Sequence, residues 1–403
     1  MTRHYTTRDF FRKMPKPLLG RYFASRGLFA WLKFDELKEG DPVELFDAWL
    51  YVPDTTRIAV EADFRDIFDL SDRKGWLAIL DEGRWHLRGE PETQRRFVLE
   101  MSALPNHYER AMVTFLDHSA LWKGAMRFHF ADSLSYWRKR KNLPKVAASV
   151  DDASIGELAS RIKMHFHTTE GRGKNCVVEP YRRGDRDYFF AYPEDHSQHG
   201  IEWVDGVFSP RPHNPAFEIV FVYDQADGSL DLNFRGAKPA VLALQSIFAH
   251  AILKIPELAP EPKEDHVYDL NPLQNKHFQF TVPVGSGIEK VAVKKMRLSS
   301  RMNQRDRVTV EADISKDSEA VYTLLDKIGR STVLSAYSVT HVELEVTLTP
   351  QGDKPLKPQT IKISHPNSCS LKYEEMDDTL RAMLASSGIE AKAAQTQVSA
   401  AAE

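Results

Sequence analysis

Histidine residues near the middle of the chain have the side chains that a metal site needs. The candidate ligands are His165, His167, His196 and His199. Imidazole nitrogens bind Zn²⁺ and other transition metals, and two ligands at positions i and i+2 face one way on an extended segment. The first pair falls at the end of a predicted helix, where the same spacing makes the side chains diverge. A metal-dependent enzyme that uses this cluster is therefore only a second alternative.

Other signatures of catalysis are incomplete. The segment from Gly171 to Lys174 (GRGK) resembles a phosphate-binding loop, but Asn175 stands where a Ser or Thr would bind Mg²⁺. Glu311 and Asp313 fall on one face of a predicted strand, yet no aspartate at suitable spacing completes a nuclease-like site. The GxSxG and HExxH motifs do not occur. We therefore expect a protein that is not an enzyme and has no cofactor.

The segment between positions 290 and 307 is strongly basic. Seven of its eighteen residues are Lys or Arg, and one is acidic. The seven are Lys290, Lys294, Lys295, Arg297, Arg301, Arg305 and Arg307. A second basic group, interleaved with aromatic residues that could stack on bases, comprises Arg172, Lys174, Arg182, Arg183 and Arg186, of which the last three are the site candidates.

Two interpretations of these basic residues stay open. On strands and their connecting loop, they could follow the phosphates of a nucleic acid or bind an acidic protein. Basic side chains on a strand are also typical of a solvated face or of a protected sheet edge. The sequence alone does not choose between these interpretations.

Composition limits the classes of partner. The 403 residues carry 54 Lys and Arg against 57 Asp and Glu, a formal net charge of −3, so the chain as a whole has no bias toward polyanions. No stretch approaches the roughly 18 apolar residues of a membrane span, and the first residues lack the apolar core of a signal peptide. Cys176 and Cys369 lie far apart, which fits a reducing compartment. We expect a cytoplasmic protein with no membrane partner.

Hydrophobic periodicity predicts the elements that position these residues. From Asp9 to about Arg138 apolar residues recur at helical spacing, and six of the seven tryptophans fall in this part. The tryptophans would fill the core or, in the alternative interpretation, anchor a partner. We predict an aromatic-rich helical domain over residues 1–141, closed by the basic run 138–141 and followed by a linker.

From Asn175 onward the apolar period changes to two, which is typical of strands. Most connections between these strands are too short for helical crossovers, so we expect antiparallel pairing. The predicted fold class is multidomain α+β, with an N-terminal all-helical domain followed by two mixed α+β modules with mainly antiparallel sheets. The modules span residues 150–254 and 275–390, and a low-complexity tail, 391–403, is predicted to be disordered.

Abundant structured surface without reactive groups favours a non-catalytic intracellular adaptor, or a subunit of a larger multiprotein assembly, that acts by protein–protein binding. The alternative is a protein that binds or senses nucleic acid through its basic stretches. A protein is thus the expected partner, and nucleic acid is the alternative one.

Overall fold

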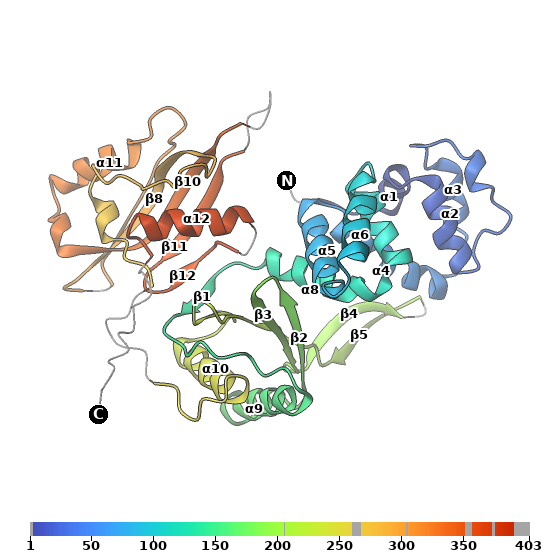
Figure 1. Cartoon of the computed structure of the whole chain (residues 1–403), viewed down its shortest axis with the longest axis horizontal. Helices are drawn as coiled ribbons and strands as arrows, with labels where there is room; N and C mark the ends of the chain where they lie inside the picture. The colour runs from blue at the N-terminus through green and yellow to red at the C-terminus, as the bar shows by residue number, and fades with distance from the viewer. Residues whose placement is uncertain are drawn as a thin grey trace. The chain divides into compact units, whose positions relative to one another are not determined.

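Figure 1 shows the computed structural model, which describes residues 3–204, 206–259, 267–303, 305–350, 357–372 and 375–390. The chain folds into two compact units. The first comprises Met1–Ser133 together with Tyr181–Gly184, and the second comprises Leu134–Pro180 and Asp185–Glu403. The prediction of an α+β class, with helices first and antiparallel strands after them, is confirmed. The predicted tail, 391–403, lies outside the described residues.

Helices build the first unit around an aromatic core. Their bounds are α1 (Thr7–Lys13), α2 (Lys16–Ser25), α3 (Val43–Trp49), α4 (Asp54–Leu70), α5 (Arg73–His86), α6 (Pro91–Ala103), α7 (His107–Asp117) and α8 (Ser119–Ser133). The Asp72 side chain accepts a hydrogen bond from Gly75 N and so caps α5, which starts the helix there. Phe64 is buried at the centre, with its ring centroid 4.7 Å from that of Phe10. Trp49 is buried in this core, whereas Trp31 is 70% exposed.

A buried carboxyl group lies between two helices of this unit. Glu82 on α5 packs against Gly124 on α8, where an added Cβ atom would collide with the carboxyl group. Glu82 Oε2 has no hydrogen-bond partner in the part of the chain that the structure describes. Burial away from water disfavours the charged form and raises the pKa of Glu82 to about 7.

This raised pKa predicts how the stability of the first unit depends on pH. The unfolded chain releases the Glu82 proton near the ordinary pKa of 4.5, but the folded unit keeps it up to about pH 7. The folded state therefore binds more protons in this window, and its stability falls by about 3 kcal/mol as the pH rises through it. We expect Glu82→Gln, which cannot ionise, to raise the free energy of unfolding at pH 8 by about 2 kcal/mol. Unchanged pH dependence in this variant would contradict the assignment.

Urea unfolding followed by tryptophan fluorescence measures this effect, because five of the seven tryptophans lie in residues 1–133. Asp81→Asn is not a suitable control, since Asp81 accepts a hydrogen bond from Arg183. Glu92→Gln, at an exposed position in the first turn of α6, is the matched control, and its pH dependence should equal that of the unmodified protein.

Among the described residues, ten strands form one sheet, which belongs to the second unit except for the last residues of β2, 181–183. Their order is β2 (Cys176–Arg183), β3 (Arg186–Pro193), β6 (Ile219–Asp224), β7 (Ser229–Asn233), β1 (Trp137–Arg140), β12 (Ser368–Cys369), β11 (Gln359–Ser364), β10 (Tyr337–Leu348), β8 (Ile288–Ser300) and β9 (Arg307–Glu311). Every neighbouring pair from β3 to β9 in this order is antiparallel. The two predicted α+β modules thus contribute strands to a common sheet.

The basic run at positions 138–141 differs from its prediction. Instead of closing the helical domain, Trp137–Arg140 forms β1, in the interior of the sheet between β7 and β12. Lys139 lies directly opposite Asp231 on β7, with 3.4 Å between its Nζ and the carboxylate. A charged strand can occupy an interior position here because a carboxylate on the neighbouring strand compensates its lysine.

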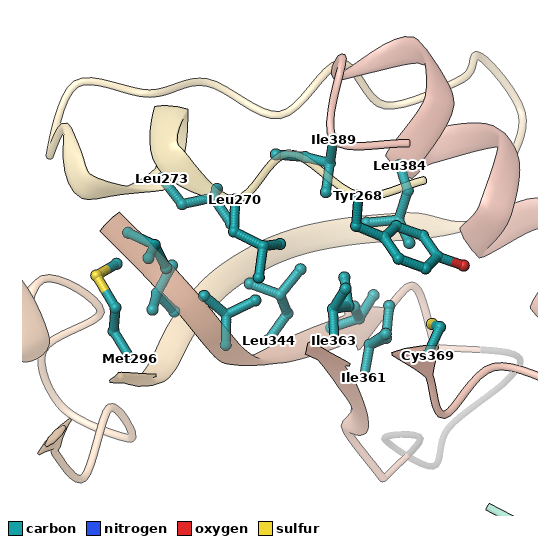
Figure 2. Packing of buried hydrophobic residues seen from close by; sticks show 14 of the residues in the cluster. Tyr268, Leu270, Leu273, Met296, Leu344, Ile361, Ile363, Cys369, Leu384 and Ile389 are labelled. Atoms are coloured by element: carbon teal, nitrogen blue, oxygen red, sulfur yellow. The ribbon is translucent and has the colours of Figure 1, made fainter. Parts of the chain in front are cut away.

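Helices cover opposite faces of the two halves of this sheet. Figure 1 shows α9 (Asp152–Glu170) and α10 (Lys238–Ala251) side by side, and α10 packs on Leu230 and Leu232 of β7. On the other half, α11 (Ala320–Gly329) and α12 (Glu375–Ser386) enclose a separate core. In Figure 2, Leu384 and Ile389 lie over Ile361 and Ile363 of β11.

The register shows that these are opposite faces. Arg138 of β1 pairs with Leu232, which faces α10, whereas the preceding residue, Trp137, pairs with Cys369 in the core under α12. Successive residues of a strand point to opposite faces. On β7, α10 covers one face of the sheet. The same face continues over β12, β11, β10, β8 and β9, where α11 and α12 cover the other side and leave it open.

A two-stranded ribbon stands apart from the large sheet. It pairs β4 (Gln198–Val204) with β5 (Val207–His213). The second of these strands contains Pro210 and Pro212. In a two-stranded ribbon each strand has an unpaired edge, where a proline without an N–H group is tolerated.

Candidate anion-binding groove

A row of polar side chains crosses the open face of the second half of the sheet. Strand register places residues of six neighbouring strands beside one another in this row. They are Arg138, Ser368, Ser364, His341, Arg297 and Thr309. Alternation along each strand sends the intervening apolar residues, such as Val342 and Ile363, into the core on the opposite face. The row thus brings basic and hydroxyl groups together from segments far apart in the chain.

Beside this row lies a cavity of about 490 Å³, which we call the anion-binding groove. Its lining consists of Arg297, Ser299, Ser300, Arg301, Arg307, Ser338, Thr340 and His365. Among the described residues, no Asp or Glu side chain lines it. A cavity lined by guanidinium and hydroxyl donors, with no carboxylate in its described lining, favours an anion.

Hydrogen bonds to hydroxyl groups orient two of these arginines. Arg301 Nε donates to Ser338 Oγ at 2.9 Å, and Arg297 Nε donates to Thr340 Oγ1 at 3.3 Å. Thr340 is the extra residue of a β-bulge in β10, which turns its side chain toward Arg297. Neither arginine forms an ion pair with any carboxylate in the described ranges. With Nε engaged, the terminal nitrogens of each guanidinium can make the two parallel contacts that suit a phosphate.

At the opposite end of the same face, the lysine side chains are paired with glutamate carboxylates. Lys295 Nζ lies 2.8 Å from Glu311, and Lys294 Nζ lies 3.3 Å from Glu345. Lys362 Nζ on β11 is 3.7 Å from Glu343. The hydrogen bond from Lys295 lowers the pKa of Glu311, which keeps this pair ionised at neutral pH. The structure thus divides the basic stretch of the sequence into paired lysines and a separate group of arginines.

Besides the paired Lys294 and Lys295, two further residues of the predicted stretch do not line the groove. Lys290 is exposed on β8 opposite Thr347, and Arg305 is exposed in the connection between β8 and β9. Conversely, His365 and the hydroxyl residues were not predicted as site residues. Ser338 and Thr340 are two positions apart at the start of β10, and Ser299 lies at the end of β8; this spacing of hydroxyls at strand ends is the one signal that could have revealed them.

The second predicted basic group is not brought together. Arg183 is buried in the first unit, where its guanidinium lies 2.8 Å from both Asp81 and Asp132. Arg182 lies near Trp85, with 5.7 Å from its guanidinium carbon to the ring centroid. Arg186 belongs to the second unit and pairs with two carboxylates there. These contacts give Arg183 and Arg186 internal partners of opposite charge.

Arg186 lines another cavity, of about 440 Å³, between β1, β7 and α12. Acidic and basic residues alternate around it and form buried ion pairs. Lys141 Nζ lies 2.8 Å from Glu390, and Lys139 pairs with Asp231. Because cations and carboxylates compensate one another here, this cavity has no comparable preference for an anion.

The predicted metal ligands are dispersed. His165 and His167 lie on α9, His199 lies on β4, and His196 is exposed in the segment between β3 and β4. The described part of the chain contains no group of three or more His, Cys, Asp and Glu side chains that could hold a metal ion.

Comparison with models of protein families and with curated proteins found no match. Among the residues that the structure describes, no helix has both the length and the apolar character needed to cross a bilayer.

Proposed function

We propose that this protein binds the phosphate backbone of a nucleic acid in the anion-binding groove and acts as a binding protein rather than as an enzyme. The observation that supports the proposal is the meeting of Arg297, Arg301 and Arg307 around hydroxyl groups in a cavity whose described lining has no carboxylate. Arginine and hydroxyl donors contact phosphate oxygens in nucleic-acid interfaces, and such contacts position a strand without reading its sequence. We therefore expect weak dependence on base sequence.

Fluorescence anisotropy with an internally labelled oligonucleotide of mixed sequence tests this proposal. Binding should be present at about 50 mM salt and should weaken steeply toward about 200 mM, because bound counterions are released from the phosphates. Absence of binding by the full chain at about 50 mM salt, to both single-stranded and double-stranded probes, would reject the proposal.

A second candidate function, that of a protein-binding adaptor or assembly subunit, is favoured by the ribbon of β4 and β5. Trp203 pairs with Phe208, and Ile201 pairs with Pro210, so these side chains share one face. Ile201, Trp203 and Phe208 are 76%, 73% and 54% exposed. An isolated two-stranded ribbon is marginally stable at best, and exposed aromatic clusters are typical of protein interfaces. A protein partner that packs on this face would stabilise the ribbon.

The adaptor proposal predicts that the double variant Trp203→Ser, Phe208→Ser loses a stoichiometric protein partner during native purification. The matched control is Val284→Ser with Val333→Ser, which removes exposed apolar side chains elsewhere in the same unit. Mass spectrometry of the purified material measures partner retention. Recovery of the unmodified protein as a lone monomer that turns over a substrate would overturn this proposal.

A further inference from the structure

A smaller cavity, of about 340 Å³, adjoins the anion-binding groove on the same face of the sheet. We call it the α10 pocket. Its lining consists of Arg138, Gly236, Ala237, Lys238, Val241, Leu242, Gln245, His365, Pro366, Asn367 and Ser368. His365 lines both cavities, and the row that joins Arg138 to Arg297 runs between them. A ligand that lies in the groove can therefore reach the pocket without leaving the open face.

The start of α10 gives this pocket a positive potential. The N-cap residue is Ala237, whose side chain has no acceptor. Pro239 has no N–H group and Ala240 N donates to Ala237 O, so Lys238 supplies the N–H group that the first turn can offer to a ligand. Lys238 is the first helical residue, and Arg138 is fixed at the pocket by a 3.1 Å hydrogen bond from its guanidinium to Gly236 O. A helix N-terminus carries a partial positive charge and favours anions, as do the two neighbouring cations.

A buried amide group in the pocket also lacks an acceptor. Gln245 is fully buried, and Arg140 donates to its Oε1 at 3.4 Å. A guanidinium can only donate, so the oxygen of the amide faces Arg140 and the nitrogen points elsewhere. Gln245 Nε2 has no partner among the described residues, although the residue lines the pocket. A small movement of the amide toward the pocket would let a ligand oxygen satisfy this donor, which is costly to leave unpaired.

The pocket lies where the open face ends. Beyond Arg138, the next residue of the row is Leu232, which is buried under α10. A nucleic-acid strand that follows the groove toward β1 therefore meets the first turn of α10 and cannot continue across the sheet. A terminal phosphate carries about 1.5 to 2 negative charges near pH 7, against one for an internal phosphodiester, and so gains more from this potential.

We propose that the α10 pocket binds the terminal phosphate of a nucleic-acid strand whose backbone occupies the anion-binding groove. This inference rests on the proposed nucleic-acid binding and adds recognition of a phosphorylated end. The ligand group that fits the pocket is a phosphomonoester, and either the 5′ or the 3′ end of a strand can carry it.

The test compares three internally labelled oligonucleotides of one sequence with the full-length protein: a 5′-phosphate, a 3′-phosphate, and hydroxyl groups at both ends. We expect one phosphorylated probe to bind about 10-fold more tightly than the hydroxyl probe. The phosphorylated probe that binds more tightly identifies the end. Equal affinity for all three probes would overturn the inference while leaving backbone binding intact, whereas failure of every probe to bind would reject the proposed function as well.

Single-residue variants distinguish the contribution of the pocket to binding from that of the groove. Lys238→Ala changes an exposed side chain, and Gln245→Leu removes the unpaired donor. Each should abolish most of the preference for the phosphorylated probe and leave affinity for the hydroxyl probe within about 2-fold. Arg297→Ala, as the matched control in the groove, should weaken all probes by the same factor. A preference that survives Lys238→Ala would also contradict the assignment.

Discussion

Simultaneous replacement of Arg297, Arg301 and Arg307 by alanine is expected to weaken oligonucleotide binding at about 50 mM salt by at least about 100-fold. Each phosphate contact releases close to one counterion, so the loss of three contacts multiplies into orders of magnitude at low salt. The effect should be similar for different base sequences, because contacts to the backbone carry no sequence information. Fluorescence anisotropy with two unrelated oligonucleotides measures both the magnitude and the uniformity of the loss.

The same face of the sheet offers a matched control for this variant. Replacing Lys294, Lys295 and Lys362 by alanine also removes three positive charges. These side chains, however, already pair with Glu345, Glu311 and Glu343. We expect this control to change affinity by less than about 3-fold. If the lysine control weakens binding as much as the arginine variant, the net charge of the face would determine affinity, and the groove would not be the site.

Replacing Asp231 by alanine is expected to lower the free energy of unfolding of the second unit by about 3–5 kcal/mol. The side chains of Lys139 and Asp231 are only 8% and 5% exposed, and they lie on adjacent strands in the interior of the sheet. Removing the carboxylate leaves the lysine ammonium buried without this charge partner. Urea unfolding followed by circular dichroism in the far ultraviolet measures the change.

A double variant distinguishes loss of charge pairing from loss of packing. Lys139→Met combined with Asp231→Leu replaces the ion pair by apolar side chains of similar size, which is often neutral or stabilising for buried pairs. We expect this double variant to unfold within about 1 kcal/mol of the unmodified protein or to be more stable. A cost below about 1 kcal/mol for Asp231→Ala alone would show that the pair does not hold β1 against β7.

Periodicity in the sequence was sufficient for most of the fold. The alternation in Val339–Leu348 predicts β10, because its apolar residues face the core under α12. The strand β1 could not be predicted in this way, since its sequence, WRKR, has no apolar alternation. What buries this strand is distant in the chain: Lys139 needs Asp231, and Arg140 reaches Gln245 on α10. Tertiary contacts of this kind leave no local pattern.

The site was predicted only in part for the same reason. The density of basic residues between 290 and 307 indicates an anionic partner, but it does not separate Arg297 from Lys295, two positions away on the same face. Their difference arises from strand pairing, which places Glu343 beside Lys295 and His341 beside Arg297. Arg138 joins the row only because β1 and β12 pair across more than two hundred residues of sequence.

The salt dependence of oligonucleotide binding tests the central claim most directly. The logarithm of the association constant should fall linearly with the logarithm of salt concentration for the unmodified protein. For the variant without Arg297, Arg301 and Arg307, we predict a slope that is shallower by about 2 for a single strand or about 3 for a duplex. Equal slopes for the two proteins, or binding that is insensitive to salt, would contradict a phosphate backbone held in the anion-binding groove.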